Sequence, residues 1–168
     1  MRNWILIILL FSFSCGTKTN KHDEEGIEEK VPLIDRIALE DLQGAPIMLN
    51  NLKGKVVFLN YWATWCKPCV KEMPSISKAS KMLKDEPVVF IVASDEDLVK
   101  IQKFVSKLSY EFEFAHSLTS VFDLDIKALP TTMIISPEGK IVFNEIGGRD
   151  WSTDRNIELI KRFISTPN

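Results

Sequence analysis

The sequence predicts an α/β domain in which a central β-sheet is layered by helices. Residues 56–61 and 88–92 are continuous apolar runs, the pattern of strands that are covered on both faces. Each run is followed by a segment with helical signals. Two further strand patterns, joined by a turn, and an amphipathic helix close the chain. This alternation of strands and helices favours helices packed on a sheet.

Composition and charge restrict the class of protein. The chain has 168 residues, enough for one domain of ordinary size. Hydrophobic residues make up 45% and charged residues 26%, which excludes a wholly disordered chain and a polytopic membrane protein. The 21 Lys and Arg against 23 Asp and Glu give a net charge of −2, so charge provides no reason to expect a nucleic-acid partner. Three cysteines allow at most one disulfide and exclude a four-cysteine zinc site.

The chain begins with the pattern of an export signal. Residues 4–13 are almost wholly apolar, too short to span a bilayer but typical of the core of a signal peptide. We therefore expect residues 1–14 to be a signal peptide. Ser14 followed by Cys15 resembles the lipobox of bacterial lipoproteins, which implies that Cys15 carries a lipid and becomes the mature N-terminus.

The segment after Cys15 is expected to be a tether. Residues 15–30 are polar and acidic, with hardly an apolar side chain, so they cannot bury enough surface to fold. They are predicted to be a lipid-anchored flexible tether that holds the domain of residues 31–168 at a membrane surface on the export side.

A hairpin is expected at the start of the domain. Residues 36–39 and 46–49 have strand character and flank a turn sequence that ends at Gly44. After the first central strand, a helix is predicted from Pro68 to about Lys84, because proline fits the first helical turn. Pro74 is expected to kink that helix.

The second half of the domain alternates in the same way. Asp95 is predicted to cap the helix that follows residues 88–92, because apolar side chains then recur at helical spacing. A short strand is expected around residues 112–114 and a short helix around residues 121–124. The remaining predicted elements are strands 131–135 and 141–143, the turn 137–140 between them, and a C-terminal helix marked by Ile157, Ile160 and Ile164.

The chemistry of the chain is concentrated at two cysteines separated by two residues. Cys66 and Cys69 lie at a strand-to-helix junction, where they can close a disulfide across one helical turn. Unpaired backbone N–H groups at the helix start favour a thiolate at Cys66, and Lys67 adds a neighbouring positive charge. Cys69 lies one turn further in and is suited to attack a mixed disulfide at Cys66.

Two cysteines at this spacing also suit other chemistry. A zinc site needs four ligands, and the only other candidates are Cys15, His22 and His116. A Cu(I) site made of two thiolates is harder to exclude. A copper-binding chaperone therefore stays open as a non-enzymatic alternative. A thiol peroxidase is the enzymatic alternative, although the usual threonine three residues before a lone peroxidatic cysteine is absent.

Several motifs, in order, resemble one family. Residues 54–69, followed by Glu72, Met73 and Pro74, are similar to the active-site block of TlpA/ResA-type thiol-disulfide oxidoreductases. The segment 129–132 and the turn 137–140 extend the resemblance to the C-terminal half. It implies a thioredoxin-like fold: a central mixed β-sheet flanked by helices, with an N-terminal β-hairpin extension and a βα insertion. It also implies a membrane-tethered protein that faces the periplasm or the cell exterior.

The resemblance assigns roles to individual residues. Cys66 matches the exposed nucleophile and Cys69 the resolving thiol of the redox disulfide. Pro130 matches the cis-proline that faces the redox pair, and Leu129, before it, matches the residue that pairs with substrate backbone. Glu72 matches a glutamate near the resolving cysteine, and its spacing of three residues from Cys69 places both on one helical face.

Neighbouring residues complete the predicted site. Asn60 stands where ordinary thioredoxins have a buried aspartate, which leaves Glu72 as the nearest carboxylate. Trp65 is expected to pack around the active-site loop and to contribute to substrate binding, while Trp62 packs around the strand. His116 is expected to be structural, without an identified partner. Lys71, Lys78 and Lys81 are expected to form a solvated helix face.

The resulting hypothesis is an extracytoplasmic reductase of protein disulfides. Electrons pass through Cys66 and Cys69, so no bound cofactor and no metal are expected. The expected partners are disulfide-containing client proteins, a membrane thiol transporter as electron donor, and the membrane itself through the lipid anchor. Many members of the family serve cytochrome c maturation, and the resemblance implies that role here.

Overall fold

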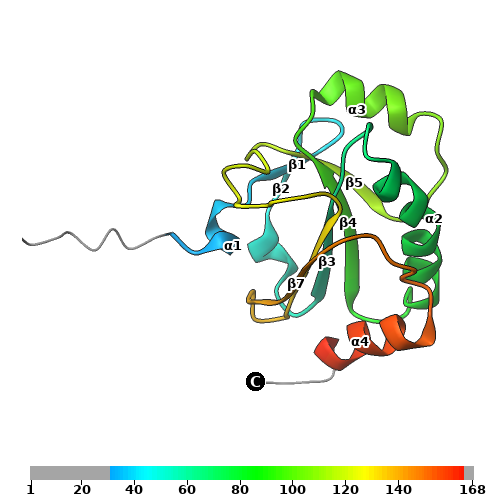
Figure 1. Cartoon of the computed structure of the whole chain (residues 1–168). Coiled ribbons are helices and arrows are strands. Elements are labelled where there is room, and N and C mark those ends of the chain that lie inside the picture. The colour runs from blue at the N-terminus through cyan, green and yellow to red at the C-terminus, as the bar shows by residue number, and fades with distance from the viewer. Residues whose placement is uncertain (1–30, 165–168) are drawn as a thin grey trace, which may run out of the picture. The chain divides into compact units, whose positions relative to one another are not determined.

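The computed structural model describes residues 31–164, which contain one seven-stranded β-sheet. The strands are β1 (Leu39–Asp41), β2 (Pro46–Ile47), β3 (Val56–Tyr61), β4 (Val88–Ser94), β5 (Glu113–Ser117), β6 (Thr131–Ile135) and β7 (Ile141–Ile146). The helices are α1 (Leu33–Arg36), the 3₁₀ helix η1 (Leu49–Leu52), α2 (Lys67–Met82), α3 (Leu98–Val105) and α4 (Asp154–Ile164). The sheet has the order β2-β1-β5-β4-β3-β6-β7 (Figure 1).

The sheet is mixed, as the resemblance implied. β4 lies at its centre and pairs in parallel with β3 on one side and β5 on the other. β6 and β7 add antiparallel strands beyond β3, and β1 and β2 add an antiparallel pair beyond β5. The segment α3–β5 lies between β4 and β6 along the chain and corresponds to the predicted βα insertion, with its helix before its strand.

Strand β3 is buried at every position, because both faces of the sheet are covered. Its side chains alternate between two hydrophobic clusters, one containing Phe58 and the other containing Leu59 and Tyr61. The first cluster receives buried side chains from α2, α3 and α4, and the second packs against residues of α1 and η1. Asn60 follows Phe58 by two residues in the same strand, so its side chain points to the same face of the sheet, toward α2.

The N-terminal hairpin is present but begins later than predicted. Residues 33–36, expected in part as strand, form α1, and the strand itself is β1. The Asp41 carboxylate explains the turn that follows, because it accepts hydrogen bonds of 2.8 Å from the N–H groups of both Gln43 and Ala45. Gly44 has a φ of +86°, a conformation that glycine adopts without cost.

Two local predictions in the second half are wrong. Asp97, not Asp95, caps α3, by accepting a hydrogen bond of 3.2 Å from the N–H of Lys100. Asp95 instead accepts a hydrogen bond of 2.8 Å from the N–H of Val121, across the sheet end. That bond helps to hold residues 121–125 as turns, where a short helix was expected.

The fold leaves the N-terminal predictions open. The signal peptide of residues 1–14, the lipid at Cys15 and the tether of residues 15–30 all lie outside the described residues. Within residues 31–164, no helix is both long enough and apolar enough to cross a membrane.

The C-terminal helix offers a test of the fold. Ile160 on α4 is fully buried in the same cluster as α2. We expect Ile160→Ala to lower the free energy of unfolding by about 2–5 kcal/mol, because it leaves a cavity in the core. Arg155→Ala, at an exposed position of the same helix, is the control and should change it by no more than about 0.5 kcal/mol. Equal effects in chemical denaturation would show that α4 does not pack as described.

Candidate active site

The two cysteines form a disulfide at the start of α2. The Sγ atoms are 2.01 Å apart, and Cys66 is the N-cap of the helix, its sulfur accepting a hydrogen bond of 3.3 Å from the N–H of Cys69. Cys69 is fully buried, and Cys66 is 4% exposed. Cys69 is the more buried of the two, as predicted. Cys66 is more enclosed than the exposed thiol expected, because it belongs to the apolar cluster that contains Trp62.

A carboxylate that sequence reasoning missed holds the loop before Cys66. Glu96 accepts hydrogen bonds from the N–H of Thr64 at 2.5 Å and from the Thr64 hydroxyl at 3.0 Å, and it forms an ion pair with Lys100. Burial alone would raise the pKa of Glu96, but the Lys100 and Thr64 contacts outweigh it and lower that pKa below its ordinary value. The loop therefore rests on a carboxylate that stays ionised.

The cis-proline segment contacts the loop that follows β7, close to the start of α2. The peptide bond between Leu129 and Pro130 is cis, as the resemblance implied. The Pro130 carbonyl accepts a hydrogen bond of 2.8 Å from the N–H of Gly147. A Cβ atom at Gly148 would lie 3.5 Å from the Pro68 carbonyl oxygen and 3.7 Å from Cγ of Pro130, so this glycine lies between the start of α2 and the cis-proline.

Glu72 is a buried carboxyl group one helical turn after Cys69. It is 5% exposed, so it is not part of the solvated face of the helix. Oε1 accepts a hydrogen bond of 2.9 Å from the Asn60 amide, and Oε2 accepts one of 3.1 Å from the N–H of Arg149. Burial raises the pKa of Glu72 above its ordinary value of 4.5, and the bonds from Asn60 and Arg149 only partly oppose this.

The sheet register explains how Asn60 reaches Glu72. Asn60 on β3 lies opposite Thr132 on β6, and its amide also donates a hydrogen bond of 2.9 Å to the Thr132 hydroxyl. A neutral amide donor thus occupies the place where ordinary thioredoxins have an aspartate. An aspartate there would face Glu72 with a second carboxylate, whereas Asn60 stabilises the Glu72 charge.

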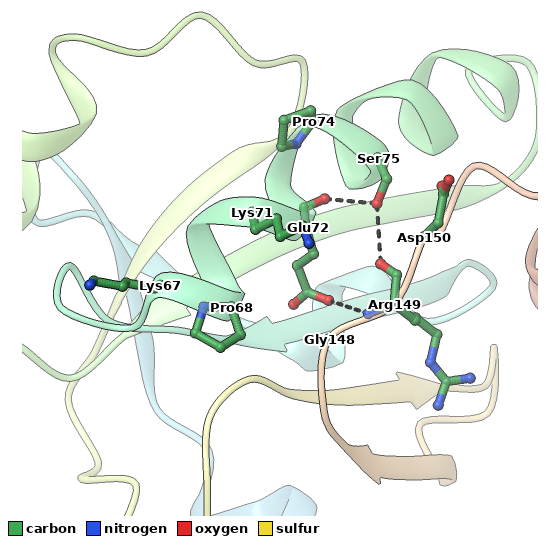
Figure 2. A pocket seen from close by; sticks show the side chains of 9 residues that line it. All are labelled: Lys67, Pro68, Lys71, Glu72, Pro74, Ser75, Gly148, Arg149 and Asp150. Carbon is green, nitrogen blue, oxygen red and sulfur yellow. Dashed lines mark hydrogen bonds between the residues drawn. The ribbon is translucent and has the colours of Figure 1, made fainter.

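A cavity of about 740 Å³ opens beside Glu72. Its lining residues come from α2 and from the loop between β7 and α4 (Figure 2). They are Lys67, Pro68, Lys71, Glu72, Pro74, Ser75, Gly148, Arg149 and Asp150. The loop residues were not predicted from the sequence, and the only local signal was the pair Gly147–Gly148 after a strand.

The other predicted residues are placed as follows. Trp62 is fully buried, but Trp65 is 68% exposed, so the expectation that Trp65 packs around the loop is wrong and its indole is free to meet a partner. Leu129 is half-buried.

His116, for which the sequence indicated no partner, has one, since its Nδ1 lies 2.8 Å from Glu40 Oε1. The exposed lysines of α2, Lys71, Lys78 and Lys81, form a solvated face as predicted.

The buried carboxyl predicts a pH effect on stability. Because the pKa of Glu72 is higher in the folded protein than in the unfolded chain, the folded state binds its proton more tightly. This contribution to stability is complete below about pH 4.5 and is lost as the pH rises through the raised pKa. Glu72→Gln, measured in the oxidised protein, has no carboxyl to titrate and should not show that loss. The free energy of unfolding of Glu72→Gln should therefore increase relative to that of wild type as the pH rises. Glu86→Gln, at an exposed position, is the control. A difference between Glu72→Gln and wild type that stays constant with pH would contradict the burial argument.

Comparison with known proteins gives one answer. Residues 27–159 match the Redoxin family. The chain is 39% identical over 127 residues to the thiol-disulfide oxidoreductase ResA of Halalkalibacterium halodurans, a match that covers 73% of this chain and 72% of the relative. It is 32% identical over 152 residues to ResA of Bacillus cereus, which covers 86% of each chain.

Solved structures agree on the fold. The thioredoxin domain of a thiol-disulfide oxidoreductase from Bacteroides vulgatus is 25% identical and matches with a TM-score of 0.64 over 77% of this chain and 93% of that one. With its redox disulfide at a helix start, the chain belongs to the Redoxin family and, within it, to the TlpA/ResA-like thiol-disulfide oxidoreductases with a thioredoxin-like fold.

Proposed function

We propose that this oxidoreductase reduces disulfides in client proteins on the outer side of a membrane, to which a lipid on Cys15 tethers it. The observation that carries the roles of the two thiols is the difference between the cysteines at the start of α2. Cys66 is the N-cap of the helix and Cys69 is completely buried in its first turn. A helix N-terminus stabilises a thiolate at Cys66, and burial disfavours one at Cys69.

The reaction follows from this difference. In the reduced protein, the Cys66 thiolate attacks one sulfur of a client disulfide, and the other client sulfur leaves as a thiolate. Cys69 then loses its proton and attacks Sγ of Cys66, which releases the second client sulfur. The two electrons have passed to the client, and the protein is left with the Cys66–Cys69 disulfide.

Glu72 is proposed to accept the proton of Cys69. A buried thiol has a pKa above its reference value of about 8.5, so it is rarely ionised near neutral pH. A carboxylate one helical turn away can take that proton directly or through water, provided that its own pKa is raised toward neutrality. Burial of Glu72 acts in that direction. The two groups then titrate as a coupled pair.

Client binding is proposed to use the residues on both sides of Cys66. The exposed Trp65 indole offers an apolar surface directly before the nucleophile. Leu129, before the cis-proline, is proposed to pair with client backbone. Because backbone pairing carries no side-chain information, this arrangement suits clients of varied sequence.

The location and partners complete the proposal. The apolar run of residues 4–13 and the Ser14–Cys15 pair support export and lipidation. A protein fixed at a membrane surface and oxidised at each turnover needs a reductant there, and a membrane thiol transporter meets that need. The named relatives are ResA proteins, and cytochrome c maturation, through reduction of the haem-binding apoprotein, is the role that we propose for this chain.

Trapping of clients tests the assignment of the two thiols. Cys69→Ser should accumulate mixed disulfides with clients, because Cys66 still attacks but nothing resolves the adduct. Non-reducing gels of export-side extracts, followed by reduction, should show these adducts. Cys66→Ser is the matched control and should trap none. The roles are reversed if Cys66→Ser traps clients and Cys69→Ser does not.

The proton acceptor is tested by the pH dependence of the rate. Glu72→Gln keeps the size and hydrogen bonding of the side chain but removes the base. We expect it to slow client reduction by roughly 10²-fold, the lower end for loss of a general base. The measurement is the pH–rate profile of both proteins in one disulfide-reduction assay. Superimposable profiles would remove Glu72 from the mechanism.

The anchor is tested by mass spectrometry of the mature protein. We expect processing before Cys15 and an acylated N-terminal cysteine. Cys15→Ala should leave the protein unprocessed or released from membranes. An exported, mature protein that still begins at Met1 would rule out the anchor.

A further inference from the structure

The loop between β7 and α4 forms a cover over Glu72. The N–H of Arg149 donates to Oε2 of Glu72 at 3.1 Å, and a Cβ atom at Gly148 would lie 3.6 Å from the same oxygen. The N–H of Gly147 is bonded to the Pro130 carbonyl. Residues 147–151, named here the cover loop, therefore touch both the buried carboxyl and the cis-proline. Figure 2 shows the bond between the N–H of Arg149 and the Glu72 carboxyl.

One side chain of α2 fastens the cover loop to the helix. The Ser75 hydroxyl accepts a hydrogen bond of 3.0 Å from the N–H of Trp151. Its own hydrogen is shared between two carbonyl oxygens, that of Glu72 at 2.7 Å and that of Arg149 at 3.3 Å (Figure 2). Ser75 follows Glu72 by three residues, so both side chains lie on the helix face that meets the loop.

We infer that Ser75 is a positioning residue, whose hydroxyl holds the cover loop on Glu72 and so controls how much water reaches the carboxyl and at what pH it can take the proton of Cys69. The inference rests on the proposed role of Glu72. Nothing in the sequence pattern of the redox motif requires a serine at this position. The inference stands on the four backbone contacts that Ser75 and Glu72 make with the cover loop and with α2.

Replacing Ser75 removes no charged side chain from the surroundings of Glu72. The uncharged Asn60 amide of β3 donates to Glu72 and also to the uncharged Thr132 hydroxyl of β6. The charged side chains around the cavity are those of Lys67, Lys71, Arg149 and Asp150. The Arg149 guanidinium forms an ion pair with Glu145 and stacks over the rings of Phe143 and Trp151, 5.4 and 5.0 Å from their centroids. Its charge also lowers the pKa of Glu72.

The direction in which loss of the Ser75 hydroxyl shifts the pKa of Glu72 depends on two opposing effects: fewer hydrogen bonds and more water. A loosened cover loop weakens both the hydrogen bond from the N–H of Arg149 and the effect of the Arg149 charge, and each loss would raise the pKa of Glu72. It also admits water, which lowers that pKa. We expect the entry of water to prevail, because burial is the largest single influence on this carboxyl. Loss of the Ser75 hydroxyl should therefore move the titration of Glu72 to lower pH.

The direct test is the titration of the Glu72 carboxyl, followed by carbon NMR in the oxidised full chain, where neither Cys66 nor Cys69 titrates. Ser75→Ala should shift the titration to lower pH, and Ser75→Thr, which keeps the hydroxyl, should restore it. Ser80→Ala is the matched control, because the Ser80 hydroxyl on the same helix donates to the Glu111 carbonyl, away from Glu72. It should leave the titration unchanged.

A second variant acts in the opposite direction and does not depend on how Ser75→Ala folds. Gly148 has no positive φ, so alanine fits its backbone, and its methyl group would come within van der Waals contact of the Glu72 carboxyl. Gly148→Ala should therefore exclude water from Glu72 and move its titration to higher pH. A shift in the same direction as that of Ser75→Ala would overturn the inference.

The kinetic arm separates this inference from the proposed function. If Glu72 is the base, Ser75→Ala should slow client reduction by roughly threefold to tenfold, less than the roughly 10²-fold for loss of the base itself. If Glu72→Gln reduces clients at the wild-type rate while Ser75→Ala still shifts the titration, the general-base proposal fails and the positioning role stands. A Ser75→Ala titration that superimposes on wild type, or a Ser80→Ala shift of equal size, overturns the positioning role.

Discussion

The burial of one carboxyl group determines how the redox end of this sheet is arranged. Taking a carboxylate out of water is costly unless hydrogen-bond donors replace the solvent. Glu72 receives its donors from two places far apart in the chain, the Asn60 amide on β3 and the N–H of Arg149 in the cover loop. Strand, helix and loop therefore meet at this side chain.

The same geometry gives the two cysteines different chemistry. Cys66 caps α2, where the helix start favours a negative sulfur, while Cys69 lies in the interior among apolar side chains. On either side the site is fixed from outside α2, by Glu96 at the loop before Cys66 and by the contacts among Gly147, Gly148 and the cis-proline. Separate parts of the chain thus fix the backbone on the two sides of the redox pair.

The interior of the fold was predictable, and its margins were not. The continuous apolar runs placed β3 and β4 correctly because strands covered on both faces need apolar side chains throughout. The bounds and caps of the short elements were not predicted correctly, because they depend on tertiary contacts. Asp95 was expected to cap α3, yet the N–H of Val121 takes its carboxylate, and Asp97 caps instead.

The site divides in the same way. Cys66, Cys69, Glu72 and Pro130 stand in motifs that a sequence reveals. Glu96 and Ser75 do not, because each acts on a partner across 32 or 74 residues, through backbone groups that leave no trace in side-chain patterns. Burial of Glu72 itself required the structure, since a glutamate on a helix next to lysines is typical of a solvated face.

The most direct test of coupling between Glu72 and the redox pair is an equilibrium measurement. The reduction potential of Cys66–Cys69 should be determined against a glutathione or dithiothreitol buffer over a range of pH, in wild type and in Glu72→Gln. If reduction of the disulfide changes the proton affinity of Glu72, the two potentials must separate or converge as the pH crosses the titration of the pair. That pH-dependent difference is the predicted result. Two parallel curves, separated by the same interval at every pH, would contradict the coupling.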